Sequence, residues 1–87
     1  LAALTEARKL TDEGSLGSAL ETCERVVERW PEEPQGWAEV GRLRLALGRH
    51  DEAVAALRRA AELAPEAVEP RLLLGQALDL LGAHVGR

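Results

Sequence analysis

The sequence predicts an all-α fold in which antiparallel helix pairs follow one another in tandem, and three observations support this. Gly14, Gly48 and Gly82 lie 34 residues apart, and Pro31 and Pro65 keep the same interval. Within each interval, apolar residues recur every three or four positions, as they do on one face of an amphipathic helix. The chain has no Phe, Tyr or Met, so its core consists mainly of Leu, Ala and Val, a composition that favours helices.

Two helices are expected in the first interval. The segment 2–13 ends before Gly14, because glycine adopts the positive φ that terminates a helix at little cost. The segment 17–30 carries the apolar stripe of Ala19, Cys23 and Val26 and ends before Pro31, because proline cannot extend a helix.

The same arrangement recurs in the following intervals. Helices are expected at 35–47, 51–64 and 69–81, ending before Gly48, Pro65 and Gly82, respectively. Asp51 stands where the start of a helix favours a capping oxygen, and Ser15 or Ser18 is suited to that role in the first interval.

Seven residues of the second unit match the tetratricopeptide repeat pattern in order and spacing. They are Trp37, Val40, Gly41, Ala53, Leu57, Ala60 and Pro65, while Arg44 replaces the Tyr of the pattern. The chain therefore resembles the tetratricopeptide repeat family, with a full copy at 34–67, a more divergent copy at 1–33 and a partial copy at 68–87. The resemblance implies a single domain over 1–87, whose helix pairs stack as a right-handed superhelix, a fragment of an α-α solenoid.

Small residues predict where the two helices of a unit cross. Gly41 and Ala53 allow close approach, and Leu at either position is expected to overpack the crossing at a cost of about 1–3 kcal/mol. Trp37, Leu57 and Ala60 are expected to fill the space between units.

The resemblance also implies that the first helix of each copy lines a concave, partner-binding groove. The partner-binding residues expected on this basis are Thr5, Arg8 and Asp12, then Gln35, Glu39, Arg42 and Leu45, and then Leu72, Leu73, Gln76, Asp79 and Leu80. The remaining groove positions are those of Leu4, Thr11, Ala38, Ala46 and Glu69. Arg8, Arg42 and Gln76 share one repeat position and are expected to form a ladder across the groove. Each arginine is expected to bind a carboxylate or to pair with Asp12 or Glu39. The leucines are expected to form an apolar end of the groove, so the expected guest is a helix or extended peptide with apolar anchors.

One known use of such grooves is not expected here. A clamp for chaperone C-terminal carboxylates needs Lys and Asn, then Asn, then Lys and Arg. The corresponding residues here are Leu4 and Arg8, then Glu39, then Glu69 and Leu73. The sequence therefore predicts no chaperone carboxylate clamp.

Composition and isolated residues argue against other functions. The net charge of -4 disfavours nucleic acid, and the apolar run 72–78 is too short for membrane insertion. Cys23 occupies the position of Leu57 in the next copy, which indicates a buried hydrophobe rather than a nucleophile. His50 and His84 share a repeat position, but two histidines alone make a weak metal site. We therefore expect no enzyme activity, no metal and no cofactor.

The leucine-rich helix gives a second hypothesis. Leucines occupy nearly all sides of the segment Leu72–Leu81, and the sequence stops before a partner helix is complete. Another copy of the chain, or further residues of a longer parent protein, would cover such a helix. The leading interpretation is a protein–protein interaction module with a groove. The alternatives are a structural or oligomerising segment and an accessory tail of a bacterial signalling enzyme, such as a chemotaxis-type methyltransferase. Composition favours a bacterial source, and the single cysteine favours a cytoplasmic location.

Overall fold

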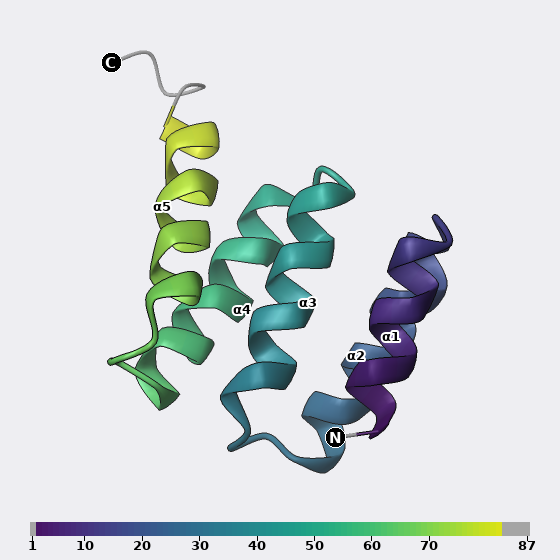
Figure 1. The fold of residues 1–87 in the computed structure, drawn as a ribbon. Coiled ribbons are helices and arrows are strands. Elements are labelled where there is room, and N and C mark those ends of the chain that lie inside the picture. Colours follow the sequence, from purple (N-terminus) through teal and green to yellow (C-terminus); the bar gives the residue numbers. More distant parts are fainter. Residues whose placement is uncertain (1, 83–87) are drawn as a thin grey trace.

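The structure is a computed structural model that describes residues 2–82 as five helices (Figure 1). The helices are α1 (Ala2–Asp12), α2 (Leu16–Arg29), α3 (Pro34–Ala46), α4 (His50–Leu63) and α5 (Val68–Gly82). No strand occurs in this range. Every helix end lies within one residue of its predicted position, and the all-α fold class is confirmed.

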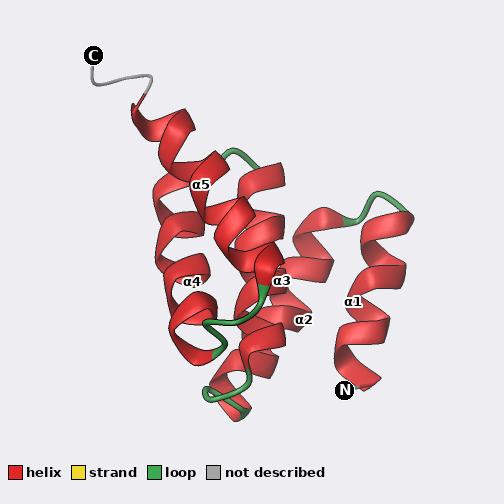
Figure 2. Cartoon of the chain, turned by 60° about the vertical axis from the view of Figure 1, so that its left-hand side comes forward, coloured by secondary structure: helices red, strands yellow, loops and turns green. Residues whose placement is uncertain are grey.

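The helices form successive pairs, with each helix packed mainly on its neighbours in sequence. α1 packs on α2, α2 on α3, α3 on α4 and α4 on α5, and α3 also contacts α5. In Figure 1, α1, α3 and α5 lie towards one face, with α2 and α4 behind them. Figure 2 shows the short loops that join successive helices. This arrangement confirms tandem helix pairs and exposes one face built only from the first helices.

The turns after α1 and α3 use the same backbone bonds. Gly14 and Gly48 have φ of +83° and +81°, the region in which glycine is favoured. The amide of Ser15 donates to the Leu10 carbonyl at 2.8 Å, and the amide of Arg49 donates to the Arg44 carbonyl at 2.8 Å. The glycine prediction is thus confirmed at both turns, while Gly82 is the last residue that the structure describes.

The capping prediction was less successful. Helix α4 begins at His50, so Asp51 lies in its first turn, and Arg49 occupies the N-cap position without a side-chain hydrogen bond. Ser15 does occupy the N-cap position of α2, but its hydroxyl makes no capping bond. An acidic residue in the first turn still interacts favourably with the helix dipole.

Two hydrophobic clusters form the core. The first joins α1, α2 and α3 with one residue of α4; its buried members are Leu4, Ala7, Ala19, Leu20, Cys23, Val26, Val27, Val40, Leu43 and Ala56. The second joins α4 to α5 through Ala53, Val54, Leu57 and Ala77. Trp37 packs against the first cluster, and Leu57 and Ala60 are fully buried. The predicted positions of Trp37 and Leu57 between the units are confirmed, and Ala60 is buried.

Gly41 marks the closest approach between α3 and α4. A Cβ atom added at Gly41 would lie 2.5 Å from both Cγ and Cδ2 of Leu57, far closer than van der Waals contact allows. Ala53 is also fully buried at this crossing. The predicted requirement for small residues is therefore confirmed.

Arg44, which departs from the repeat pattern, connects three helices. Its Nη1 donates to the Glu52 carbonyl of α4 at 3.2 Å, and its Nη2 lies 3.5 Å from Glu24 Oε2 of α2. An aromatic ring at this position would supply packing, whereas the guanidinium supplies polar bonds.

Among the described helices, none is long and apolar enough to cross a membrane.

Candidate binding groove

Two adjoining hollows lie on the face formed by α1, α3 and α5. The first, of about 320 Å³, is lined by Leu4, Thr5, Arg8, Gln35, Ala38, Glu39 and Glu69. The second, of about 250 Å³, is lined by Arg8, Thr11, Asp12, Glu39, Arg42 and Leu43. Arg8 and Glu39 line both hollows, so the two form one surface, which we call the groove.

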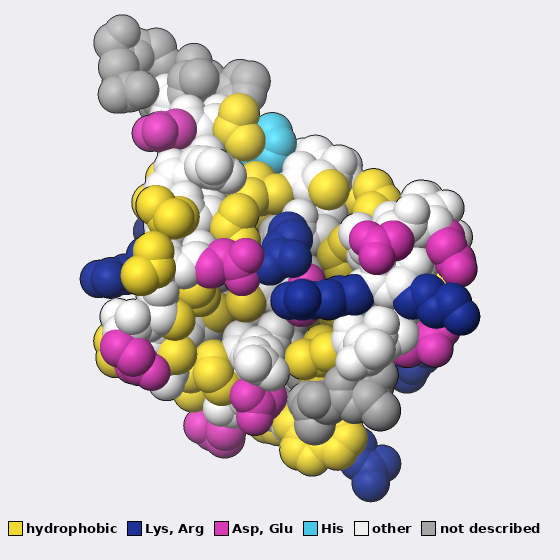
Figure 3. All heavy atoms as spheres, viewed as in Figure 1, with side chains coloured by type: hydrophobic (Ala, Val, Ile, Leu, Met, Phe, Trp, Pro, Cys, Tyr) yellow, Lys and Arg dark blue, Asp and Glu magenta, His cyan; other side chains and the backbone are white. Residues whose placement is uncertain are grey.

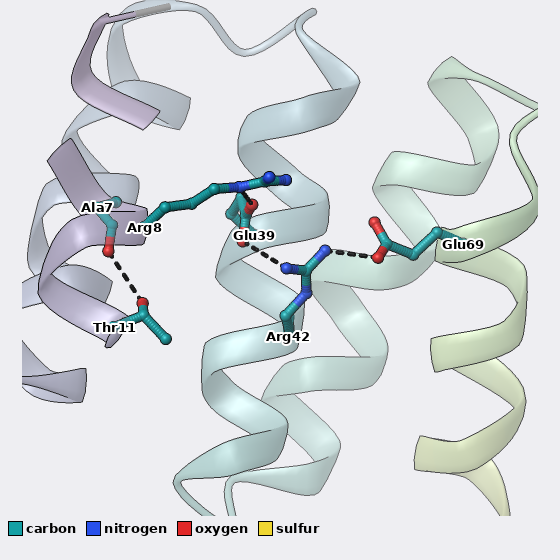
Figure 4. A network of polar contacts seen from close by, with 6 residues as sticks. All are labelled: Ala7, Arg8, Thr11, Glu39, Arg42 and Glu69. Atoms are coloured by element: carbon teal, nitrogen blue, oxygen red, sulfur yellow. Dashed lines mark hydrogen bonds and ion pairs between the residues drawn. The ribbon is translucent and has the colours of Figure 1, made fainter. Parts of the chain in front are cut away.

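Four charged side chains cross the groove in an alternating row (Figure 4), which we call the ion-pair chain. Arg8 Nε of α1 donates to Glu39 Oε2 of α3 at 2.9 Å. Arg42 Nη1 lies 3.4 Å from Glu39 Oε1, and Arg42 Nη2 donates to Glu69 Oε2 of α5 at 2.6 Å. The ion-pair chain therefore links the three helices that form the groove.

Glu39 is the central residue of this chain and is only 7% exposed. Burial of a carboxylate is costly unless its oxygens are paired, and here each oxygen faces a guanidinium. The hydrogen bond to Glu39 in turn raises the pKa of Arg8. The Arg8 side chain remains 66% exposed, so its outer nitrogens reach solvent while its Nε holds Glu39.

Half of the predicted partner-binding residues line the hollows, as do Leu4, Thr11, Ala38 and Glu69 from the remaining predicted groove positions. Thr5, Arg8, Asp12, Gln35, Glu39 and Arg42 do so. Leu45 and Leu73 instead pack against the second core cluster. Leu72, Gln76, Asp79 and Leu80 are exposed on α5 but line neither hollow. The expected apolar end of the groove is therefore not formed by Leu73, whose side chain contributes to the core.

The expected ladder also differs from the observed one. Arg8 and Arg42 pair with Glu39 as expected, but no hydrogen bond joins Gln76 to them among residues 2–82, and α5 contributes Glu69 instead. Leu43, which was not among the expected groove residues, also lines the second hollow.

The spacing of the ion pairs along the sequence contains a further signal, which the prediction of Arg–Glu39 pairing did not use. Arg8 and Glu39 are 31 residues apart, and Arg42 and Glu69 are 27 apart. These separations are one 34-residue repeat minus about one and two helical turns. Opposite charges at such offsets face one another on equivalent helices of adjacent units.

Other reactive side chains lie outside the groove. Cys23 is fully buried, and burial raises the pKa of its thiol to about 11, so it is protonated at neutral pH. His50 is the half-buried first residue of α4, and His84 lies outside the described residues. Within the described range, no three His, Cys, Asp or Glu residues cluster as metal ligands do. The groove thus offers paired charges and small apolar side chains, which are suited to binding.

The distribution of side chains differs across this face. Figure 3 shows acidic and basic side chains interspersed along the middle of the face and hydrophobic side chains over α5.

The carboxylates of Glu39 and Glu69 occupy two positions at which a chaperone clamp requires amide or basic side chains.

Comparisons with known proteins agree with this architecture. A family model described as tetratricopeptide repeat matches residues 4–68 and 39–86. The chain is also similar to a solved structure of the globular C-terminal domain of P. aeruginosa LpoP, with 31% sequence identity and a TM-score of 0.86. The similarity covers 94% of this chain and 81% of that one. No curated protein compared with the chain matches it.

Proposed function

Because the chain belongs to the tetratricopeptide repeat family, we propose that it is a non-enzymatic protein-interaction module that binds a partner peptide in its groove. The family and the fold support the coarser statement, a module for protein–protein interaction. Use of this particular groove, rather than another surface, is the further step that the proposal adds.

The observation that carries the proposal is the chemistry of the two hollows. Leu4 and Ala38 form a small apolar floor and are 7% and 8% exposed, while Thr5 and Gln35 are exposed at the rim. An extended segment placed there covers apolar surface and meets polar side chains along its backbone.

Arg8 adds a preference for acidic groups. Its Nε holds Glu39, and its side chain is two-thirds exposed. A guest carboxylate can therefore bind the outer nitrogens of Arg8 in a charge-assisted bond without displacing Glu39. We accordingly propose a peptide with a small apolar residue beside an acidic one.

The test uses rim substitutions that leave the ion-pair chain intact. Peptides selected on the wild-type protein from a random-sequence phage library would be titrated by calorimetry against Thr5→Glu and Gln35→Glu. Each variant places a long acidic side chain over the hollow and is expected to weaken binding at least about tenfold, a loss of about 1.4 kcal/mol. Ser18→Glu on α2, also an exposed position, is the control and is expected to bind like the wild type.

Equal binding by all three variants would show that the selected peptides use another surface. Selection of no acidic peptide would refute the role of Arg8. A cytoplasmic location remains a prediction from the single cysteine, and fractionation of cells that express the protein would test it.

A further inference from the structure

Helix α5 lacks on one side the neighbour that α3 has. Gly41 of α3 lies beneath Leu57 of α4, whereas at Gly75, one repeat later, nothing lies within 4 Å of the Cβ position. Ala77, Leu73, Leu74 and Leu81 pack towards the second core cluster. The opposite side of α5 has no packed helix among residues 2–82.

This side, which we call the α5 outer face, consists of Val68, Arg71, Leu72, Gly75, Leu78 and Asp79. Their spacing of three and four residues places them on one face of the helix. Val68 is 60% exposed, Leu72 64% and Leu78 41%. Exposed apolar side chains grouped in this way mark interaction surfaces.

The α5 outer face is symmetric about Gly75. Leu72 and Leu78 lie three residues before and after it, and Arg71 and Asp79 lie four residues before and after it. When two copies of a helix pair antiparallel about a twofold axis at Gly75, residue 72 meets residue 78 of the other copy. Residue 71 likewise meets residue 79, so two leucine contacts and two Arg–Asp pairs form at once.

The geometry points to a second copy of this chain as the occupant, and we propose that α5 pairs with its counterpart in an antiparallel, twofold-symmetric dimer. Such an interface is self-complementary, as a twofold dimer requires. Gly75 allows the two backbones to approach as Gly41 does at the α3–α4 crossing. The α5 helix of the second copy would then pack on α5 at Gly75 in the way that α4 packs on α3 at Gly41.

Charge supports this orientation over the parallel one. A parallel pair would set Arg71 against Arg71 and Asp79 against Asp79, which is unfavourable. Among the described residues, neither Arg71 nor Asp79 takes part in an ion pair, so both are available. Because the contact is one 15-residue helix on each side, it falls at the small end of interfaces. We therefore expect dissociation constants between about 10 µM and 1 mM.

The test is a charge exchange followed by sedimentation equilibrium up to about 1 mM protein. Arg71→Asp alone and Asp79→Arg alone each create two like-charge contacts and are expected to weaken self-association at least about tenfold. An equimolar mixture of the two variants restores both opposite-charge contacts, so it is expected to form a heterodimer. The double variant is expected to self-associate within about threefold of the wild type.

The control is Arg25→Asp, an exposed charge reversal on α2, which is expected to leave association unchanged. Circular dichroism would confirm that each variant is folded. A wild-type chain that stays monomeric at the highest concentration would overturn the proposal and point to a different occupant of the face. Single variants that associate like the wild type, or a mixture that fails to pair, would refute the antiparallel register. Peptide binding in the groove does not depend on any of these outcomes.

Discussion

The Gly41 crossing gives the sharpest test of the packing, because Gly75 provides a matched control. Both glycines lie within helices and occupy the same repeat position. A new methyl group at Gly41 would lie 2.5 Å from two carbons of the fully buried Leu57, while at Gly75 it would meet nothing within 4 Å. The same substitution therefore separates helix propensity from overpacking.

The expected magnitudes follow from two opposing effects. Gly→Ala in a helix stabilises by about 0.5–1 kcal/mol, and overpacking a core costs about 1–3 kcal/mol. Gly41→Ala is thus expected to lower the free energy of unfolding by about 1 kcal/mol, and Gly75→Ala to raise it by about 0.5–1 kcal/mol. The two variants should differ by about 2 kcal/mol, or about 8–16 °C in Tm for a domain of this size.

Chemical and thermal unfolding would be followed by helical circular dichroism at a concentration at which sedimentation shows a monomer. Leu57 cannot easily move aside because it is fully buried in the second core cluster. Equal stability changes in the two variants would refute the inference that Gly41 is required by a close contact.

Two further predictions concern buried ionisable groups. Because the pKa of Cys23 is raised to about 11 in the folded chain, its stabilising contribution is complete below its unfolded value near 9 and is lost as the pH rises towards 11. Between these pH values the wild type should lose up to about 2–3 kcal/mol of its free energy of unfolding through ionisation of Cys23, and Cys23→Ala should remove this loss. Few other groups titrate in this interval, because the chain has no Tyr and Lys9 is its one lysine. An equal pH dependence of the unfolding free energy in the two proteins would contradict the raised pKa of Cys23. Glu39→Gln removes a buried charge held by two arginines and should destabilise by about 1–2 kcal/mol. Glu28→Gln at an exposed site is the control, and urea unfolding gives the free energy of unfolding of each variant. Equal decreases in the two variants would show that the buried ion pairs of Glu39 do not stabilise the fold.

The sequence was sufficient to predict the fold because its signals are local. Gly14 and Gly48 end helices through their own φ, Pro31 and Pro65 through their missing amide hydrogen, and a 34-residue interval fixes how many helices form a unit. None of these depends on a distant residue. The helix boundaries therefore agreed with the structure to within one residue.

The groove was harder to predict because it depends on how successive units are rotated and shifted. Leu72 and Leu73 are adjacent and chemically identical, yet Leu73 packs on the second core cluster and Leu72 is exposed. The difference is set by the rotation of α5, with Ala77 buried against α4. The Arg42–Glu69 pair likewise requires the axial offset between α3 and α5, which composition does not encode.

The division of the core into two clusters without a common residue has a consequence for how the molecule could be altered. The main packing contacts among residues 2–82 connect α1 and α2 to α5 through α3 and α4, so a defect at either end reaches the other chiefly through these two helices. A helix pair inserted between existing ones would need to reproduce only the contacts at its two borders. Length can thus change while the contacts within each helix pair are kept, a property that a single shared interior does not have.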